Sequence, residues 1–282
     1  MEKIAIVVDS ATDVTDYIRG DHNIFRIPLQ INIGDKSYTD GVDITGEEVF
    51  QAMETSKVSS SLPGGEVIEK LFNDIKEQGY THAIVVTITS AMSGTYNVIR
   101  NFTEAFEGMK IAVIDTLRIS VGAGYVAVRA SEKLEAGYTF DEILKDIEDT
   151  KLNANVFFTL STLDYLIKGG RIGAVAGTVA NVLNLRPVIS VSDEGVYYTC
   201  AKARGYQKAI TKTIDAAYDY VKDLDKYRVV LLHADSKMDF AKIMAYAKSK
   251  FDKAEEISIE KISVALSTHS GREGFGVGVS RV

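Results

Sequence analysis

Three strand-like runs in the first half of the chain, each ending in polar residues, constrain the fold more than any other feature. They span residues 4–8, 82–88 and 110–115. A run that is apolar at almost every position suits a strand buried on both faces, as in the centre of a parallel sheet. Helical patterns separate the three runs. This alternation predicts a doubly wound α/β domain, whose ligand lies outside the carboxyl ends of the strands.

The polar residues at these strand ends mark a candidate ligand site. Asp9 and Ser10 follow the first run, residues 90–93 follow the second, and Asp115 ends the third. The pattern predicts Ser93 as the N-cap of a helix over about 96–106, where free backbone N–H groups and the helix dipole suit an anion. A plain helix cap without a ligand is the alternative for Ser93, and residue statistics alone favour it.

The second half of the chain has a different texture. The chain of 282 residues is long enough for two domains. Beyond residue 155 the strand patterns come closer together, and residues 193–195 (Asp-Glu-Gly) give a hairpin signal. Hairpins mixed with helices predict a smaller α+β layer sandwich. We therefore expect an α/β domain over residues 1–155 and an α+β domain over residues 156–282.

Four local expectations lie outside the apolar runs. Residues 25–33 read as one strand, and residues 57–65 as a polar, turn-prone loop. Residues 174–185, rich in small side chains, predict a helix, and residues 257–266 predict a strand. The glycines at 274, 276 and 278 fall on a final strand pattern, where tight approach of the strand backbone to a neighbour is the ordinary reason for glycine.

Composition excludes several classes of function. A net charge of −7 and a pI near 5.3 argue against a nucleic-acid surface. Cys200 is the single cysteine, so we expect no disulfide framework and no thiolate metal site. The sequence contains no phosphate-loop, nucleophile-elbow or HExxH motif. No apolar segment approaches the ~20 residues of a membrane span, and the N-terminal run is short for a signal peptide, so we expect a cytoplasmic protein.

Two further residues are candidates for binding an anion. Arg171 follows two glycines, which let the backbone turn closely and aim the guanidinium at a carboxylate or phosphate. A surface arginine in a helix-starting loop explains the same spacing equally well. His269 stands at a plausible ligand-facing end, although a lone histidine is more often structural. A catalytic triad is the sharper alternative for Ser93, and His233 and His269 are the two histidines at plausible ligand-facing ends.

Taken together, the motifs resemble those of the DegV family over essentially the full chain. These are the fatty-acid-binding proteins that serve bacterial fatty acid kinase in the FakB role. Order and approximate spacing are kept throughout, so the set is specific where a single motif is not. Arg272 and Glu273 depart from the family, which has proline and glycine there. The matching segments are DSATD (9–13), SSLPG (60–64), TSAMSGTY (89–96), YLIKGGRIG (165–173) and THSGREGFGVG (268–278).

The resemblance implies a Rossmann-like N-terminal domain closed by the smaller C-terminal one, with a long-chain fatty acid in an apolar tunnel between them. It places Ser60 and Ser93 at the pair that holds the carboxylate, with Ser61 as second choice for Ser60. Arg171 and His269 match residues at the same polar end. No metal, catalytic residue or cofactor other than the bound fatty acid is implied.

The resemblance also implies a division of labour. The protein would present its fatty acid to a separate ATP-dependent fatty acid kinase, which forms the acyl phosphate for phospholipid synthesis. Transient contact with a membrane is compatible with this role. The alternative from another class is a hydrolase of acyl or phosphoryl groups that uses Ser93 with His269 and Arg171. A regulatory protein that binds another small carboxylate is the third hypothesis.

Overall fold

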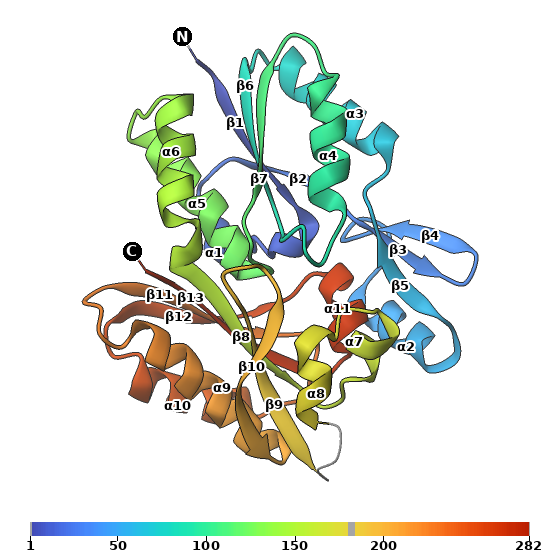
Figure 1. The fold of residues 1–282 in the computed structure, drawn as a ribbon, viewed down its shortest axis with the longest axis vertical. Helices are drawn as coiled ribbons and strands as arrows, with labels where there is room; N and C mark the ends of the chain where they lie inside the picture. Colours follow the sequence, from blue (N-terminus) through green and yellow to red (C-terminus); the bar gives the residue numbers. More distant parts are fainter. Residues whose placement is uncertain (1, 180–183, 282) are drawn as a thin grey trace.

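The first sheet is parallel, as the three runs predict. The computed structural model describes residues 2–179 and 184–281, and its N-terminal half contains a four-stranded sheet in which every pair of neighbours is parallel. Helices cover both faces (Figure 1). The strands lie in the order β2 (Ile24–Ile27), β1 (Ile4–Asp9), β6 (His82–Thr87) and β7 (Lys110–Asp115).

Alternation along β1 explains how the sheet buries both faces. Ile4, Ile6 and Val8 pack in the cluster that contains α5 (Val121–Glu135) and α6 (Phe140–Thr150). Ala5 and Val7 pack in the opposite cluster, with α3 (Gly65–Glu77) and α4 (Thr95–Glu104). Because successive side chains point to opposite faces, an apolar residue at every position is what a sheet covered on both sides requires. The expected doubly wound α/β fold is confirmed.

The second half of the chain forms a six-stranded sheet. Its neighbours are antiparallel except for one parallel pair, β11 with β12. Helices α9 (Tyr206–Val221) and α10 (Phe240–Lys250) cover one face, and the other face turns toward α5. The strands lie in the order β10 (Tyr197–Arg204), β9 (Leu185–Val191), β8 (Ala154–Leu160), β13 (Gly274–Arg281), β11 (Tyr227–His233) and β12 (Ala254–Lys261).

A small third sheet corrects two expectations. The predicted strand over 25–33 is two strands, because Pro28 has no N–H to continue a ladder: β2 stays in the parallel sheet and β3 starts another. The predicted loop over 57–65 contains a strand, whose pairing with β3 overrides its polar composition. The sheet has the order β4 (Lys36–Thr39), β3 (Gln30–Ile33) and β5 (Val58–Ser61), with α2 (Gly46–Thr55) between β4 and β5 in the chain.

Two more local expectations were wrong in part. The strand predicted over 257–266 ends at Lys261, because Ser263 caps a new helix by accepting a hydrogen bond from the Leu266 N–H. This helix, α11 (Val264–Ser270), carries His269. The helix predicted over 174–185 consists of a 3₁₀ turn and α8 (Ala176–Val179), residues 180–183 lie outside the described residues, and Leu185 already belongs to β9. Shorter helical segments are η1 (Ser10–Thr12), α1 (Asp16–Arg19), η2 (Lys151–Asn153), α7 (Asp164–Lys168) and η3 (Gly173–Val175).

Arg118 joins the two halves. It follows β7, is 1% exposed, and donates through Nε to the Ala154 carbonyl at 2.7 Å and through Nη1 to the Ser192 carbonyl at 2.9 Å. Its Nη2 pairs with Asp193 at 2.8 Å. The β9–β10 hairpin is therefore fixed against the carboxyl end of the parallel sheet. The boundary at residue 155, between the sheet ending with β7 and the one that includes β8, stays a prediction. Over the described ranges, no helix has the length and apolar character to cross a membrane.

Candidate ligand-binding pocket

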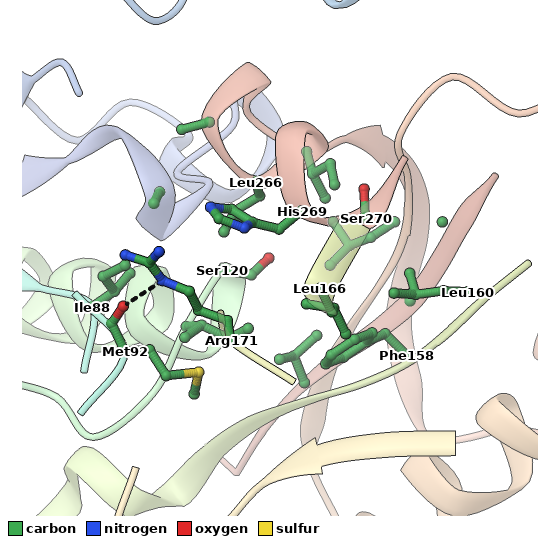
Figure 2. Close-up of a pocket in the computed structure, with 18 of the residues that line it drawn as sticks. Ile88, Met92, Ser120, Phe158, Leu160, Leu166, Arg171, Leu266, His269 and Ser270 are labelled. Atoms are coloured by element: carbon green, nitrogen blue, oxygen red, sulfur yellow. Dashed lines mark hydrogen bonds between the residues drawn. The ribbon is translucent and has the colours of Figure 1, made fainter. Parts of the chain in front are cut away.

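A pocket lies where the carboxyl ends of the parallel strands face the six-stranded sheet. The loops after β1, β6 and β7 form one side, the inner face of β8, β11 and β13 forms the other, and α7 and α11 close it. Figure 2 shows Arg171 and Met92 on one side of the pocket and Phe158 and Leu160 on the opposite side. Most of the wall is apolar, with Ile88, Val156, Phe158, Leu160, Leu166 and Leu232 among its residues.

Four of the five predicted site residues line this pocket: Ser60, Ser93, Arg171 and His269. They come from β5, from the loop before α4, from the loop after α7 and from α11. Segments up to 209 residues apart in the sequence therefore meet at one polar end, as the hydrogen bond between Ser60 and His269 illustrates. Whether these residues hold a carboxylate stays a prediction at this point.

The Ser60 hydroxyl and the His269 imidazole form the central pair, with 2.8 Å between Oγ and Nε2. Burial, and to a smaller extent the nearby Arg171 charge, lower the pKa of His269 to about 4. The imidazole is therefore neutral at pH 7. Its Nδ1 is buried and has no hydrogen-bond partner in the described part of the chain.

Gly169 explains why two glycines precede Arg171. A Cβ atom on Gly169 would lie 2.4 Å from Nδ1 of His269, closer than side chains approach one another. The glycine lets the backbone of this loop rest against the imidazole. Gly169 therefore fits the loop to His269 and brings Arg171 to the pocket, which the sequence had suggested from glycine's flexibility alone.

Ser93 is not the N-cap of α4, as predicted, but the residue before it. The N-cap of α4 is Gly94, and the helix begins at Thr95. The Ser93 hydroxyl accepts a hydrogen bond from the Thr95 N–H at 3.2 Å and shares another with the Thr95 hydroxyl at 2.8 Å. This local pairing replaces the longer reach of a cap side chain. Ser93 is still close to the amino end of α4 and lines the pocket.

Arg171 bridges two loops of the pocket. Its Nε donates to the Met92 carbonyl at 3.2 Å, and its Nη1 donates to the Gly169 carbonyl at 2.5 Å. The residue is exposed, so its charge is available at the surface end of the pocket. The sequence left open whether Arg171 faces a pocket or only solvent. In the structure Arg171 lines the pocket and is also exposed to solvent.

Ser61 points away from the other candidates. Successive side chains of β5 face opposite sides, and the Ser61 hydroxyl accepts a hydrogen bond from Asn32 Nδ2 at 2.9 Å. Ser59, opposite Asn32 in the β3–β5 ladder, shares this side of the strand. Among the three adjacent serines, Ser60 is the one that lines the pocket.

Two buried carboxylates that the sequence analysis did not single out hold α11 in place. Asp13 Oδ1 accepts a hydrogen bond from the Ser263 N–H at 2.7 Å, and Asp40 Oδ1 accepts one from the Val264 N–H at 3.1 Å. The negative charges lie at the amino end of the helix, where its dipole favours them. Asp13 belongs to the DSATD motif, but contacts across more than 200 residues leave no local signal.

The pocket residues missed from the sequence are mainly its apolar walls. Phe158 and Leu160 alternate with buried neighbours along β8, so their pattern predicted a strand without indicating which face lines a cavity. Ser120, in the loop before α5, also lines the pocket and was not predicted as a site residue. Within residues 2–179 and 184–281, no cluster of three or more histidine, cysteine or acidic side chains could hold a metal ion.

The comparisons with known proteins agree on one family. The protein-family model described as "Uncharacterised protein, DegV family" matches residues 3–282. A DegV domain-containing protein of Clostridium acetobutylicum is 36% identical over 257 residues, which cover 91% of this chain and 89% of that protein. A counterpart of Clostridium perfringens is 32% identical and covers 100% of this chain and 99% of its own.

Solved structures extend the similarity to proteins with known ligands. A fatty-acid-binding DegV family protein from Thermus thermophilus superimposes with a TM-score of 0.90 at 26% identity, over 99% of this chain and 100% of that one. A stearic-acid-binding protein from Eubacterium ventriosum gives a TM-score of 0.87 at 28% identity, over 99% and 98% of the two chains. The match over nearly the whole sequence shows that this chain belongs to the DegV family, in which proteins of the same fold bind fatty acids.

Proposed function

We propose that this protein binds a long-chain fatty acid and presents its carboxylate to a separate ATP-dependent kinase. The observation that carries the proposal is a single pocket with apolar walls and one polar end, at which Ser60, Ser93, Arg171 and His269 meet. A fatty acid has the same division into a long apolar chain and one anionic end. The proposal places the protein in the cytoplasm, where the kinase finds its ATP.

Burial of the acyl chain supplies most of the affinity in this proposal. Each buried CH₂ contributes about 0.8 kcal/mol, so a chain of about 16 carbons outweighs the net gain from a few hydrogen bonds. The polar end therefore fixes the orientation of the ligand more than its affinity. It also compensates the carboxylate for lost hydration, which would otherwise oppose binding.

The protonation state of His269 supports a role for Ser60 as donor to the carboxylate. With its pKa lowered to about 4, His269 is neutral and its Nε2–H can donate to Ser60 Oγ. The Ser60 hydroxyl hydrogen is then free to point toward the ligand. Arg171 adds the positive charge, and its exposure leaves this end of the ligand within reach of a partner enzyme.

The same geometry weakens the hydrolase alternative. His269 pairs with Ser60, whereas Ser93 pairs with Thr95, so in the described part of the chain no histidine is hydrogen-bonded to the predicted nucleophile. A pKa of about 4 is far below the value near 7 that suits a general base at neutral pH. Over the described residues, His269 Nδ1 has no hydrogen-bond partner, so no carboxylate orients the ring as in a catalytic triad.

Denaturing extraction followed by mass spectrometry tests the proposal directly. Near-stoichiometric fatty acid is expected from the purified protein, and Ser93→Ala and Arg171→Ala should each weaken binding of added fatty acid, by roughly tenfold, without changing the melting curve. A protein that is empty and refuses added fatty acid would refute the binding role. Turnover of an acyl or phosphoryl ester, lost in Ser93→Ala, would establish the hydrolase instead.

The kinase partner needs a separate experiment. The loaded protein alone with ATP should form no acyl phosphate, and addition of a fatty acid kinase subunit from a DegV-containing bacterium should start its formation. Arg171→Ala, saturated with fatty acid, should slow this transfer. Failure of any such kinase to phosphorylate the bound ligand would remove the presenting role and leave binding untouched.

A further inference from the structure

Three glycines on β13 share the inner face of the six-stranded sheet. Phe275, Val277 and Val279 pack in the cluster formed with α9 and α10, so the alternating residues Gly274, Gly276 and Gly278 face the other way. A glycine in a strand weakens it, because it provides no side chain to pack and loses more conformational freedom on folding. Each glycine on this face therefore needs a reason.

Close backbone approach, the reason expected from the sequence, holds for Gly278. A Cβ atom there would lie 2.0 Å from Cγ2 of Val121, so α5 can pack on the sheet only if residue 278 has no side chain. Gly274 is also crowded, because a Cβ atom would lie 3.1 Å from Cβ of Ser270 in α11. At these two positions the packing of helices accounts for glycine.

At Gly276, neither the backbone conformation nor the packing of a helix requires glycine. Its φ is not in the left-handed region, so the backbone does not require glycine. A Cβ atom would lie 3.4 Å from the Phe157 carbonyl oxygen and 3.5 Å from Cβ of both Leu232 and Phe158, which is ordinary van der Waals contact. A larger residue at 276 is therefore compatible with the fold, and β-branched residues would even favour the strand.

Gly276 instead leaves space in the pocket. Phe158 and Leu232 are its direct partners on the two neighbouring strands, and all three residues line the pocket. Directly opposite residues in a sheet share a face, so two large side chains flank a position that has none. Phe158 lies on the side of the pocket away from Arg171 (Figure 2). The gap beside Phe158 therefore lies on the side of the pocket opposite Arg171.

We infer that Gly276 determines which acyl chains the pocket accepts, by leaving room for the distal part of the chain between Phe158 and Leu232. This inference rests on the proposed fatty-acid binding and adds a specificity-determining residue to it. A side chain at 276 occupies that room and shortens the accepted chain, while the contacts of Ser60, Ser93 and Arg171 with the carboxylate stay unchanged.

A graded series, Gly276→Ala, Gly276→Val and Gly276→Leu, tests the inference. Each delipidated variant is titrated with saturated fatty acids of different lengths, and the acids it carries from the cell are identified by mass spectrometry. Affinity for the longest acid bound by the wild type should fall progressively, at least about tenfold for Gly276→Leu, because several CH₂ groups lose their place. Affinity for the shortest acids should change less than about twofold.

Gly65→Leu is the matched control. It adds the same side chain at a position where no atom lies within 4 Å of the new Cβ, and it should leave the chain-length profile unchanged. Folded Gly276→Val and Gly276→Leu proteins with the wild-type profile would overturn the inference, while fatty-acid binding itself would stand. A wild-type protein that binds no fatty acid would refute the proposed function, and the inference about Gly276 with it. If Gly276→Leu does not fold, Gly276→Ala and Gly276→Val decide the matter.

Discussion

The polar end of the pocket differs in its hydrogen bonding from a cluster of three buried carboxylates, Asp9, Asp13 and Asp40. Both connect the N-terminal half with α11 or the loops near it. In the cluster, every carboxylate accepts hydrogen bonds from at least two donors of the protein, mostly backbone N–H groups, and Asp40 also pairs with Arg26. At the polar end, the Ser60 hydroxyl has one partner in His269 and Arg171 is exposed.

The difference separates polar groups that stabilise the fold from polar groups that are available to a ligand. A buried polar group that is fully satisfied by its own chain fixes the fold and has little left to offer a ligand. A group with spare donors is costly to bury and is retained where a ligand completes it. The acidic cluster would attract attention as a site by its residue types, yet its contacts assign it to the fold, whereas Ser60 and Ser93 line the pocket that we propose as the binding site.

The largest expected effect comes from breaking the satisfied cluster at Asp9. Its two oxygens accept from the N–H groups of Ala11 at 2.9 Å and Ile88 at 2.8 Å. In Asp9→Asn an amide NH₂ replaces one acceptor and leaves a buried N–H unpaired, so we expect a loss of about 3 kcal/mol in the free energy of unfolding. Urea denaturation of the delipidated protein measures it.

Asp13→Asn is the matched comparison. Asp13 accepts from one backbone N–H and from the Ser120 hydroxyl, and a hydroxyl can reverse its role and accept from the new amide. The expected loss is therefore about 1 kcal/mol or less. Equal losses in the two variants would show that charge, and not the pattern of donors, decides the stability of the cluster.

The pH dependence of stability should sharpen the comparison, because the two regions have opposite signs. Burial raises the pKa of Asp9 to about 7 and that of Asp13 to about 6. Their folded-state pKa values exceed the unfolded ones, so their contribution is complete at low pH and is lost as pH rises through 6 to 7. His269, with its pKa lowered to about 4, contributes stability above pH 6.5 that is lost as pH falls.

From pH 8 to pH 6 the free energy of unfolding of the delipidated protein should therefore rise, on the order of 1 kcal/mol, with His269 opposing the carboxylates. His269→Gln should enlarge the rise and Asp13→Asn should reduce it. Denaturation curves at three pH values in this window provide the test. A wild-type protein that loses stability between pH 8 and pH 6 would contradict the assigned signs.

The sequence allowed the parallel sheet to be predicted because its signal is local. Each buried strand carries its own apolar run, and the polar residues after it mark the ligand-facing edge. The strand Val58–Ser61 was missed because three serines give no such signal and its partner β3 lies some 30 residues earlier. The start of α11 was missed for a similar reason, since part of what fixes it comes from Asp13 and Asp40.

The candidate site shows the same division between local and distant information. Ser60, Ser93, Arg171 and His269 could be named from motifs, but their meeting in one pocket depends on contacts between the two halves of the chain. The walls could not be named, because an apolar residue in a strand looks alike whether it faces a helix or a cavity. Gly276 and Gly278 illustrate this, being identical in the sequence pattern and different in their surroundings.

Binding measurements should distinguish two adjacent serines of β5, Ser60 and Ser61. Ser60→Ala removes a donor from the pocket and should weaken fatty-acid binding about tenfold or more, because one hydrogen bond to a charged group contributes about 1.5 kcal/mol or more. Ser61→Ala removes only the contact with Asn32, so binding should change less than about twofold. Titration of delipidated protein with a fluorescent fatty acid measures both.

Ser60→Thr completes the set, because it keeps the hydroxyl. Threonine is also favoured in strands, so the variant should fold normally and bind within about twofold of the wild type. If Ser61→Ala weakened binding as much as Ser60→Ala, the hydroxyl facing Asn32 would have to turn toward the ligand when it binds. The alternation of side chains along β5 would then no longer decide which serine holds the carboxylate. For Ser60 and Ser61, the hydrogen bonds made within the protein would not predict which hydroxyl binds the ligand.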